Sequence, residues 1–126
     1  MYISSKGAFE PGKQEGKTMI RNSELMKGIA PAVILKLLSE RAMYGYEIIR
    51  LVNERTNGEF QWKEGALYPC LHKMENEGLL ASEWRIVEGK PRKYYALTGT
   101  GKELVEEKVN ESRTFCTALN QLLCFE

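Results

Sequence analysis

The chain has 126 residues, a net charge of +1, and 43% hydrophobic against 28% charged residues. This length suits one globular domain, and the composition is that of an ordinary globular protein. No apolar run approaches the roughly 20 residues that a membrane-spanning helix needs. The first residues also lack the pattern of a secretory signal. We therefore expect a cytoplasmic protein with no membrane span.

Three cysteines, Cys70, Cys116 and Cys124, include no CxxC pair. In a cytoplasmic protein such residues are expected to be buried thiols, with a redox switch as the alternative. His72 is the only histidine, and no Cys–His spacing suits zinc. The sequence also contains no Gly-rich phosphate loop, nucleophile elbow or HExxH motif. We expect no cofactor, no metal and no enzymatic activity.

The first part of the chain is expected to contain an arm and a helix. Residues 1–20 are rich in Gly, Lys, Ser and Gln and show no apolar period, so we interpret them as a disordered arm or a leader. Because Pro31 interrupts the helical pattern after this arm, we expect a short first turn and a main helix over residues 31–41. Apolar residues recur there at helical spacing: Leu25, Ile29, Val33 and Leu37.

Two further helices are expected in the middle of the chain. One covers about residues 46–56 and stops at an Asn-Gly pair. The other covers about residues 65–77, and Pro69 is compatible with it only if the helix begins a few residues earlier. Its inward apolar stripe is Leu67, Leu71 and Met74.

A hairpin is expected next, with strands over residues 82–87 and 92–97 that are rich in β-forming side chains. The turn between them is Glu88-Gly89-Lys90-Pro91. Tyr94 and Tyr95 point to opposite faces of their strand, so one of them belongs to the core. The hairpin has a basic tip, formed by Arg85, Lys90, Arg92 and Lys93.

A last helix is expected from a capping box at Thr100 and Glu103 to about Leu123. Its apolar seam is too long for one small domain to cover, so we expect it to pack against a second copy of the chain. The acidic residues beside the seam, such as Glu107 and Glu111, are interpreted as a solvated face. The expected dimerisation residues are Leu104, Val105, Val109, Ser112, Phe115, Cys116, Leu119, Leu122 and Leu123.

Three helices followed by a hairpin is the element order of a winged helix. The expected fold is therefore mainly α with a small β-hairpin, comprising a winged helix-turn-helix domain over residues 21–99 and a C-terminal dimerisation helix over residues 100–126. A helix fits the major groove of DNA, and the third helix is placed to enter it. The hairpin cations would then meet phosphates or the adjacent minor groove.

Four segments resemble the PadR family of bacterial transcriptional regulators in order and spacing. They are YGYEI from Tyr44, EGALYPCLHKME from Glu64, EGLL from Glu77 and PRKYYALT from Pro91, and the resemblance covers about residues 25–108. Tyr44 stands where the family usually has histidine. The single C-terminal helix resembles the shorter subgroup, which implies dimerisation through that helix.

The resemblance also implies a function. Family members are mostly repressors that bind palindromic operators as dimers, and some release DNA when a small aromatic or drug-like molecule binds. The implied partners are double-stranded DNA, a second copy of the chain and a small hydrophobic or aromatic effector. Winged helices also bind proteins, so a protein–protein interaction module is the alternative function.

The expected DNA-binding residues lie on the third helix, beside it and on the hairpin. Tyr68 and His72 share an outer face of the helix, and Lys63 and Lys73 are expected to meet phosphates. Pro69 either contacts a thymine methyl or has only a conformational role. The whole set is Tyr46, Lys63, Gly65, Ala66, Tyr68, Pro69, His72, Lys73, Lys90, Arg92 and Lys93.

Three aromatic residues have two interpretations. By resemblance Tyr46 touches a phosphate through its hydroxyl, and the alternative is an aromatic lid on the core. Trp62 and Trp84 are expected to pack where the hairpin meets the third helix, and the alternative is an aromatic cage for a flat ligand. The C-terminal helix offers Phe115 and no tryptophan for such a cage.

Overall fold

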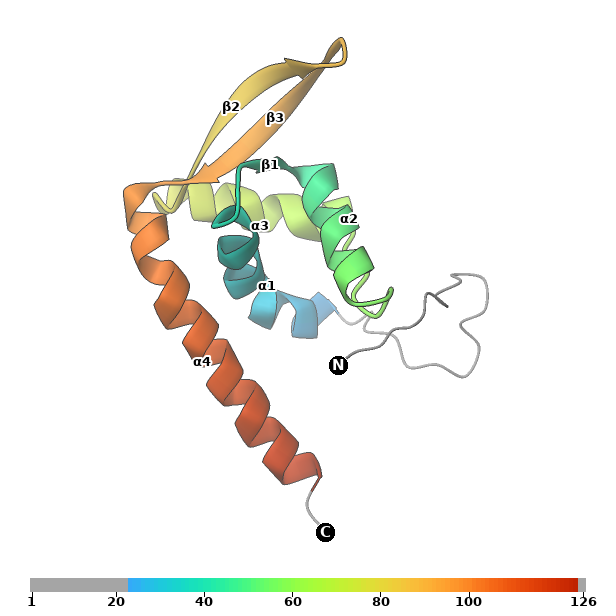
Figure 1. Ribbon diagram of the computed structural model, residues 1–126, viewed down its shortest axis with the longest axis vertical. Helices are drawn as coiled ribbons and strands as arrows, with labels where there is room; N and C mark the ends of the chain where they lie inside the picture. The colour runs from blue at the N-terminus through green and yellow to red at the C-terminus, as the bar shows by residue number, and fades with distance from the viewer. Residues whose placement is uncertain (1–22, 125–126) are drawn as a thin grey trace.

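The structure is a computed structural model that describes residues 23–124, so the arm predicted over residues 1–20 lies outside the described residues. Helices cluster beneath a projecting hairpin, and one long helix runs down the side of the molecule (Figure 1). The elements are α1 (Ser23–Leu38), β1 (Met43–Tyr44), α2 (Gly45–Arg55), α3 (Glu64–Asn76), β2 (Leu80–Val87), β3 (Lys90–Leu97) and α4 (Gly99–Leu123). The predicted mainly helical fold with a hairpin is confirmed.

Helix α1 runs unbroken through Pro31, so the predicted offset and the predicted end at residue 41 are both wrong. Proline removes one helical hydrogen bond, to the carbonyl of Lys27. Lys27 is exposed, so solvent can bond that carbonyl, while packing of the other face holds the helix together. The helix ends at Leu38, and directly after it the hydroxyl of Ser39 donates to the Lys36 carbonyl at 2.6 Å.

The core forms where α1 meets α2, α3 and the base of the sheet. Ile34 and Leu35 of α1 are fully buried, as is Ile48 of α2. From α3 the core receives the predicted stripe of Leu67, Leu71 and Met74. This packing fixes α3 against the body and leaves its other side turned outward.

The sheet has three antiparallel strands in the order β1-β3-β2, and β1 was not predicted. The turn between β2 and β3 has two residues, Glu88 and Gly89, with φ of 53° and 80°. Two positive φ angles define the tight turn that suits a twisted hairpin, and glycine adopts the second without strain. The predicted four-residue turn is therefore wrong, because Lys90 and Pro91 belong to β3.

The two tyrosines of β3 separate as predicted. Tyr95 pairs with Met43 of β1 and is 1% exposed, so it belongs to the core. Tyr94 is half-buried on the opposite face of the strand. Beyond this point the β2–β3 hairpin extends past the helices as a wing (Figure 1).

Helix α4 begins two residues earlier than predicted. The hydroxyl of Thr98, not of Thr100, caps it by accepting from the Gly101 amide at 3.1 Å. The same hydroxyl donates to the Gly78 carbonyl at 2.6 Å, which ties the helix start to the end of α3. The first turns of α4 pack against the core through Leu104 and Val105, and the rest extends away from the sheet.

Candidate nucleic-acid interface

Helix α3 presents a free outer face. Pro69, His72 and Lys73 are exposed, opposite the buried stripe. The helix begins at Glu64, so Pro69 lies in its second turn, as the sequence required. The outer face of α3 is thus open to a ligand as large as a duplex.

Tyr68 lies at the boundary between the core and the outer face of α3. It is half-buried, and its ring lies against Gly45 at the start of α2, where any side-chain carbon would overlap the phenol. Burial raises the pKa of the Tyr68 hydroxyl, which keeps it neutral and able to donate a hydrogen bond. His72 lies beside it, with the ring centroids 6.4 Å apart.

Tyr46 lies in the first turn of α2 and is 55% exposed. This exposure does not fit a lid over the core. The neighbouring Glu47 is held by Arg41, whose guanidinium donates to Glu47 Oε2 at 2.6 Å. Tyr46 is therefore an available aromatic hydroxyl next to α3.

A groove of about 430 Å³ separates the wing from the starts of α2 and α3. It brings together five of the predicted DNA-binding residues: Tyr46, Tyr68, His72, Arg92 and Lys93. Glu64 and Trp84 also line it, and neither was predicted to belong to the site. The helix and the wing thus present one continuous hollow surface.

The other predicted DNA-binding residues lie outside this groove. Lys63, Gly65 and Ala66 line a second hollow at the start of α3, together with Lys27 and Trp62. Lys90 is exposed next to the turn of the wing, whereas Pro69 and Lys73 are exposed along α3. The predicted set therefore spans a broad surface and not a single pocket.

The cations of the wing diverge because strand residues alternate between faces. On one face the guanidinium of Arg92 lies 4.5 Å from the ring centroid of Tyr44, and Arg85 lies 4.3 Å from that of Tyr94. The two tyrosine rings meet edge to face at 5.4 Å. On the other face Lys93 lies over Tyr95 at 5.6 Å.

This ladder of two arginines and two tyrosines was not predicted. It depends on β1, which brings Tyr44 opposite Tyr94 in the sheet. Cation–π contacts at such sites contribute about 0.5–1 kcal/mol each. The available signal was Tyr44 itself, which replaces the usual histidine of the resembled family with a larger aromatic ring.

The prediction that both tryptophans pack at the join of hairpin and helix is wrong for Trp84. Trp62 is 5% exposed, but Trp84 is 67% exposed. The two-residue turn lengthens the wing and pairs Trp84 with Lys93, beyond the part of the sheet that the helices cover. No aromatic cage forms from these two residues, because one is buried and the other is on the wing.

The prediction of buried thiols is also wrong. Cys70 is half-buried, and burial raises the pKa of its thiol, whereas Cys116 and Cys124 are exposed on α4. The α4 sites are exposed because the helix runs past the end of this subunit's core. Within residues 23–124, no group of three or more His, Cys, Asp or Glu side chains could hold a metal ion.

The predicted dimerisation residues divide into three groups along α4. Leu104 and Val105 pack against this chain's own core. Val109, Ser112 and Cys116 line an apolar groove of about 580 Å³ between α4 and α1. The remaining residues, Phe115, Leu119, Leu122 and Leu123, are exposed apolar side chains.

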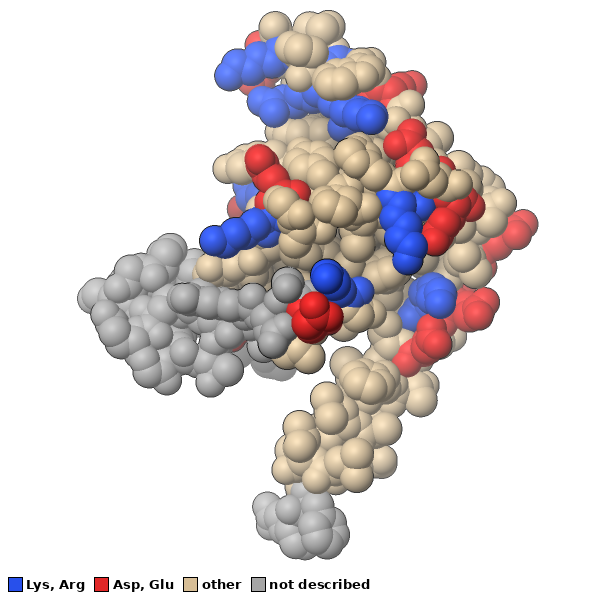
Figure 2. All heavy atoms as spheres, turned by 180° about the vertical axis from the view of Figure 1, so that it is seen from behind, with Lys and Arg blue, Asp and Glu red and all other residues tan. Residues whose placement is uncertain are grey.

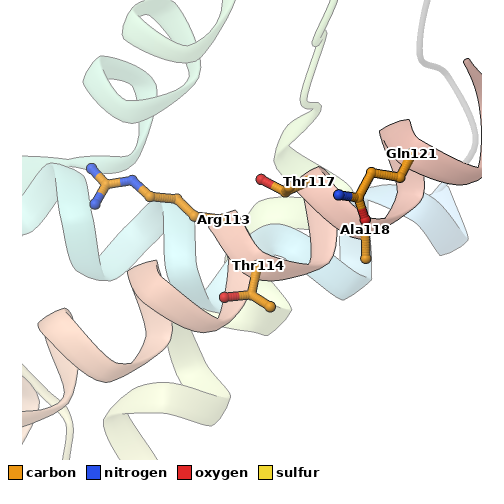
Figure 3. Close-up of a pocket in the computed structure, with 5 residues that line it drawn as sticks. All are labelled: Arg113, Thr114, Thr117, Ala118 and Gln121. Carbon is orange, nitrogen blue, oxygen red and sulfur yellow. The ribbon is translucent and has the colours of Figure 1, made fainter.

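A shallower depression further along α4 offers no chemistry. Its lining residues all come from this one helix: Arg113, Thr114, Thr117, Ala118 and Gln121 (Figure 3). Arg113 is its single ionisable group, so it holds no acid–base pair. The charges of the molecule gather elsewhere, with basic side chains over the wing (Figure 2).

An exposed helix face beside a basic wing is the DNA-docking arrangement of winged-helix proteins. Residues 34–107 match the transcriptional regulator PadR-like family. The chain belongs to this family, and its members are DNA-binding transcriptional regulators, not enzymes. The resemblance inferred from the four motifs is confirmed.

Known relatives agree with this assignment. A transcriptional regulator of Mycobacterium tuberculosis, Rv3488, is 39% identical over 57 residues, which is 45% of this chain and 53% of the relative. A transcriptional regulator from Clostridium thermocellum has a similar structure, with a TM-score of 0.70, 30% identity and coverage of 78% of this chain and 96% of the other. A PadR-like regulator from Bacillus cereus gives a TM-score of 0.69, 32% identity and coverage of 82% and 99%.

Among the described helices, none combines the length and apolar character that crossing a membrane requires.

Proposed function

We propose that the chain is a homodimeric repressor that occupies a palindromic operator. The observation that carries this proposal is the continuous surface of α3 and the wing, where His72, Tyr46 and Lys93 meet around one groove. An α-helix fits the major groove of B-DNA, and its exposed side chains reach base edges. In this arrangement α3 reads bases while the lysines and arginines neutralise phosphates.

The dimer forms through α4. Phe115, Leu119, Leu122 and Leu123 are 64%, 40%, 76% and 74% exposed in the single chain. A patch of this kind on one helix supports pairing with an identical helix. The apolar groove between α1 and α4 lies next to this patch.

The two copies place two α3 helices on one side of the duplex. Helix-turn-helix dimers contact half-sites about one DNA turn apart, or roughly 34–36 Å. A two-fold axis between the α4 helices then requires an operator with the same symmetry. When such a dimer is bound over a promoter, it blocks transcription by occupying the site. This takes place in the compartment that contains the DNA.

A small hydrophobic or aromatic effector is part of the proposal. The groove between α1 and α4 has an apolar wall that includes Ile29, Val33 and Phe60. A ligand there would change how α4 sits against the winged-helix part and hence the distance between the two α3 helices. The ligand would change the population of the DNA-binding state by an amount set by the difference in its affinity for the two conformations.

The test is selection of bound sequences from a pool of random duplexes. The proposal expects enriched palindromes whose half-site centres are about 10 bp apart. Enrichment of sequences without symmetry would contradict the dimer, and failure to enrich any sequence would contradict sequence-specific binding. If a heparin column does not retain the protein and the protein does not shift genomic fragments in a gel, the protein–protein interaction module is favoured.

A further inference from the structure

The outer half of the wing exposes two large apolar side chains on the same face. Trp84 is 67% exposed and Ile86 is 72% exposed, and they are two residues apart on β2. Their cross-strand partners on β3 are Lys93 and Pro91. Single exposed apolar residues are common on protein surfaces. Here, however, adjacent ones form a strip with a lysine at its edge.

This strip faces the groove in front of α3. Toward the base of the wing, the same face of the sheet carries the buried Leu80 and Tyr95. Trp84, Pro91 and Lys93 line the groove that also contains His72. The tryptophan therefore lies on the side of the wing that a duplex bound to α3 would meet.

We propose that Trp84 and Ile86 are apolar DNA contacts, with the indole packed against the deoxyribose wall of the minor groove next to the major groove that α3 occupies. This inference rests on the proposed docking of α3 and adds two residues that the DNA-binding set does not contain. Apolar side chains are a known mode of minor-groove contact, where they wedge between base steps, whereas here the indole lies against the sugars.

The charge around the strip selects DNA as its occupant. Lys93 is directly opposite Trp84 in the sheet and shares its face, whereas Lys90 lies opposite Val87 on the other face of the wing, beside the turn. The backbone of DNA alternates anionic phosphates with apolar sugars, so a face that sets a cation, Lys93, beside apolar side chains matches it. A second copy of this chain would have to bury Lys93 against its own wing.

Tryptophan fluorescence provides a direct test, because Trp62 is 5% exposed and Trp84 is 67% exposed. Acrylamide quenching of the free protein therefore acts mainly on Trp84, and a Trp84→Phe variant, which retains only the buried Trp62, should be poorly quenched. The probe is the tightest-binding duplex from the random pool. We expect this duplex to protect Trp84 of the wild type from acrylamide.

Binding by a Trp84→Ala variant provides the second readout. We expect roughly a ten-fold loss of affinity, equivalent to about 1.4 kcal/mol, which corresponds to burial of about 60 Å² of apolar surface. Because an apolar contact releases no counterions, the salt dependence of binding should not change. A Lys93→Ala variant should instead reduce the slope of log K against log salt by about 0.9 for each subunit. The matched control is Val87→Ala, which lies on the opposite face of β2. We expect this variant to bind the duplex with the affinity of the wild type.

The outcomes separate the inference from the function on which it rests. If Trp84 stays fully quenchable in the complex, or if Trp84→Ala binds as tightly as the wild type, the inference is overturned while DNA binding stands. If the wild type binds no duplex from the pool, both the Trp84 contact and the proposed DNA-binding function are contradicted. Protection of Trp84 together with weaker binding at an unchanged salt slope supports the contact.

Discussion

The outer half of the wing and the second half of α4 both extend beyond the core, and both expose large apolar side chains. On the wing, Trp84 and Ile86 share their face with Lys93, and three further cations, Arg85, Lys90 and Arg92, lie on the opposite face. On α4, residues 114–123 contain no charged side chain at all. An exposed apolar surface calls for a partner, and the charge beside it indicates which kind of partner that is.

The physical reason lies in desolvation. A cation buried against a neutral protein surface loses hydration without compensation, whereas against a phosphate it gains an opposite charge. An uncharged apolar helix face has no such cost when an identical face covers it. The wing is therefore suited to a polyanion and the end of α4 to a second copy of itself.

The largest expected effect follows from placing a charge on the uncharged region. In Leu119→Glu, a carboxylate would be buried in the helix pair, so the dimer should dissociate to the 14.4 kDa chain in sedimentation. Because the two half-sites are then bound independently, operator affinity should fall by about 100-fold. Thr114→Glu, a polar position beside the seam, is the matched control and should remain dimeric. A dimeric Leu119→Glu protein would contradict the pairing through α4.

Removal of charge from the wing should have the next largest effect. Replacement of Lys90, Arg92 and Lys93 by alanine removes six cations from a dimer. Affinity should fall by more than about ten-fold for every duplex, and the salt slope should become shallower by up to about 5. Titrations at several salt concentrations measure both quantities. An unchanged slope would remove the wing from the interface.

A substitution at the junction between the wing and α4 tests how α4 is held, and it leaves both the DNA-facing wing and the dimerisation face of α4 unchanged. A side-chain carbon at Gly101 would overlap the Leu79 backbone carbonyl, so Gly101→Ala should lower the free energy of unfolding by about 2 kcal/mol. Gly99→Ala is the matched control, because no atom lies within 4 Å of that position. Denaturant titration of both variants measures the difference. Equal stability would show that α4 is not seated as described.

The ring ladder provides a smaller test of how the wing is held. Tyr44→Ala removes the ring under Arg92 and the edge contact with Tyr94. We expect a loss of about 1 kcal/mol in stability and faster amide exchange in β1 and β3. Tyr44→Phe retains the ring and should behave as the wild type. A similar loss in both variants would assign the effect to the hydroxyl and not to the ring.

The smallest expected effect lies away from both regions, at the ion pair of Glu40 and Arg55. The hydrogen bond from Arg55, at 2.9 Å, holds the pKa of the Glu40 carboxyl below its ordinary value. A carboxyl with a lowered folded-state pKa stabilises the fold above its unfolded-state pKa, and this contribution is lost as pH falls through the folded-state value. Both side chains are substantially exposed, so Arg55→Ala should cost only a few tenths of a kcal/mol at neutral pH. Melting curves should show this difference shrinking in acid, and a constant difference would contradict the assignment.

The sequence predicted the helices and the wing well because their apolar spacing is regular. The stripe of Leu67, Leu71 and Met74 is buried as expected. Strand β1 was missed because two residues carry no periodicity, and its pairing depends on Tyr94 and Tyr95 from far along the chain. The helix cap at Thr98 was missed because its second partner, the Gly78 carbonyl, is also distant in sequence.

The candidate interface was predicted in part. The pattern placed His72 and Lys73 on an outer face, where the structure has them exposed. It placed Trp84 wrongly at the join of the hairpin and the third helix, because a tryptophan is highly buried on average. Only the register set by the two-residue turn moves this side chain beyond the core. Whether these residues touch DNA stays a prediction.

The most direct measurement is the affinity of the wild-type dimer for its selected duplex across a range of salt concentrations. Docking of α3 and both wings engages up to ten cations, five from each subunit, so log K should fall steeply with log salt, with a slope between about −4 and −9. A slope near zero would mean that the lysines and arginines around α3 do not meet phosphates, and the account of this surface would be wrong.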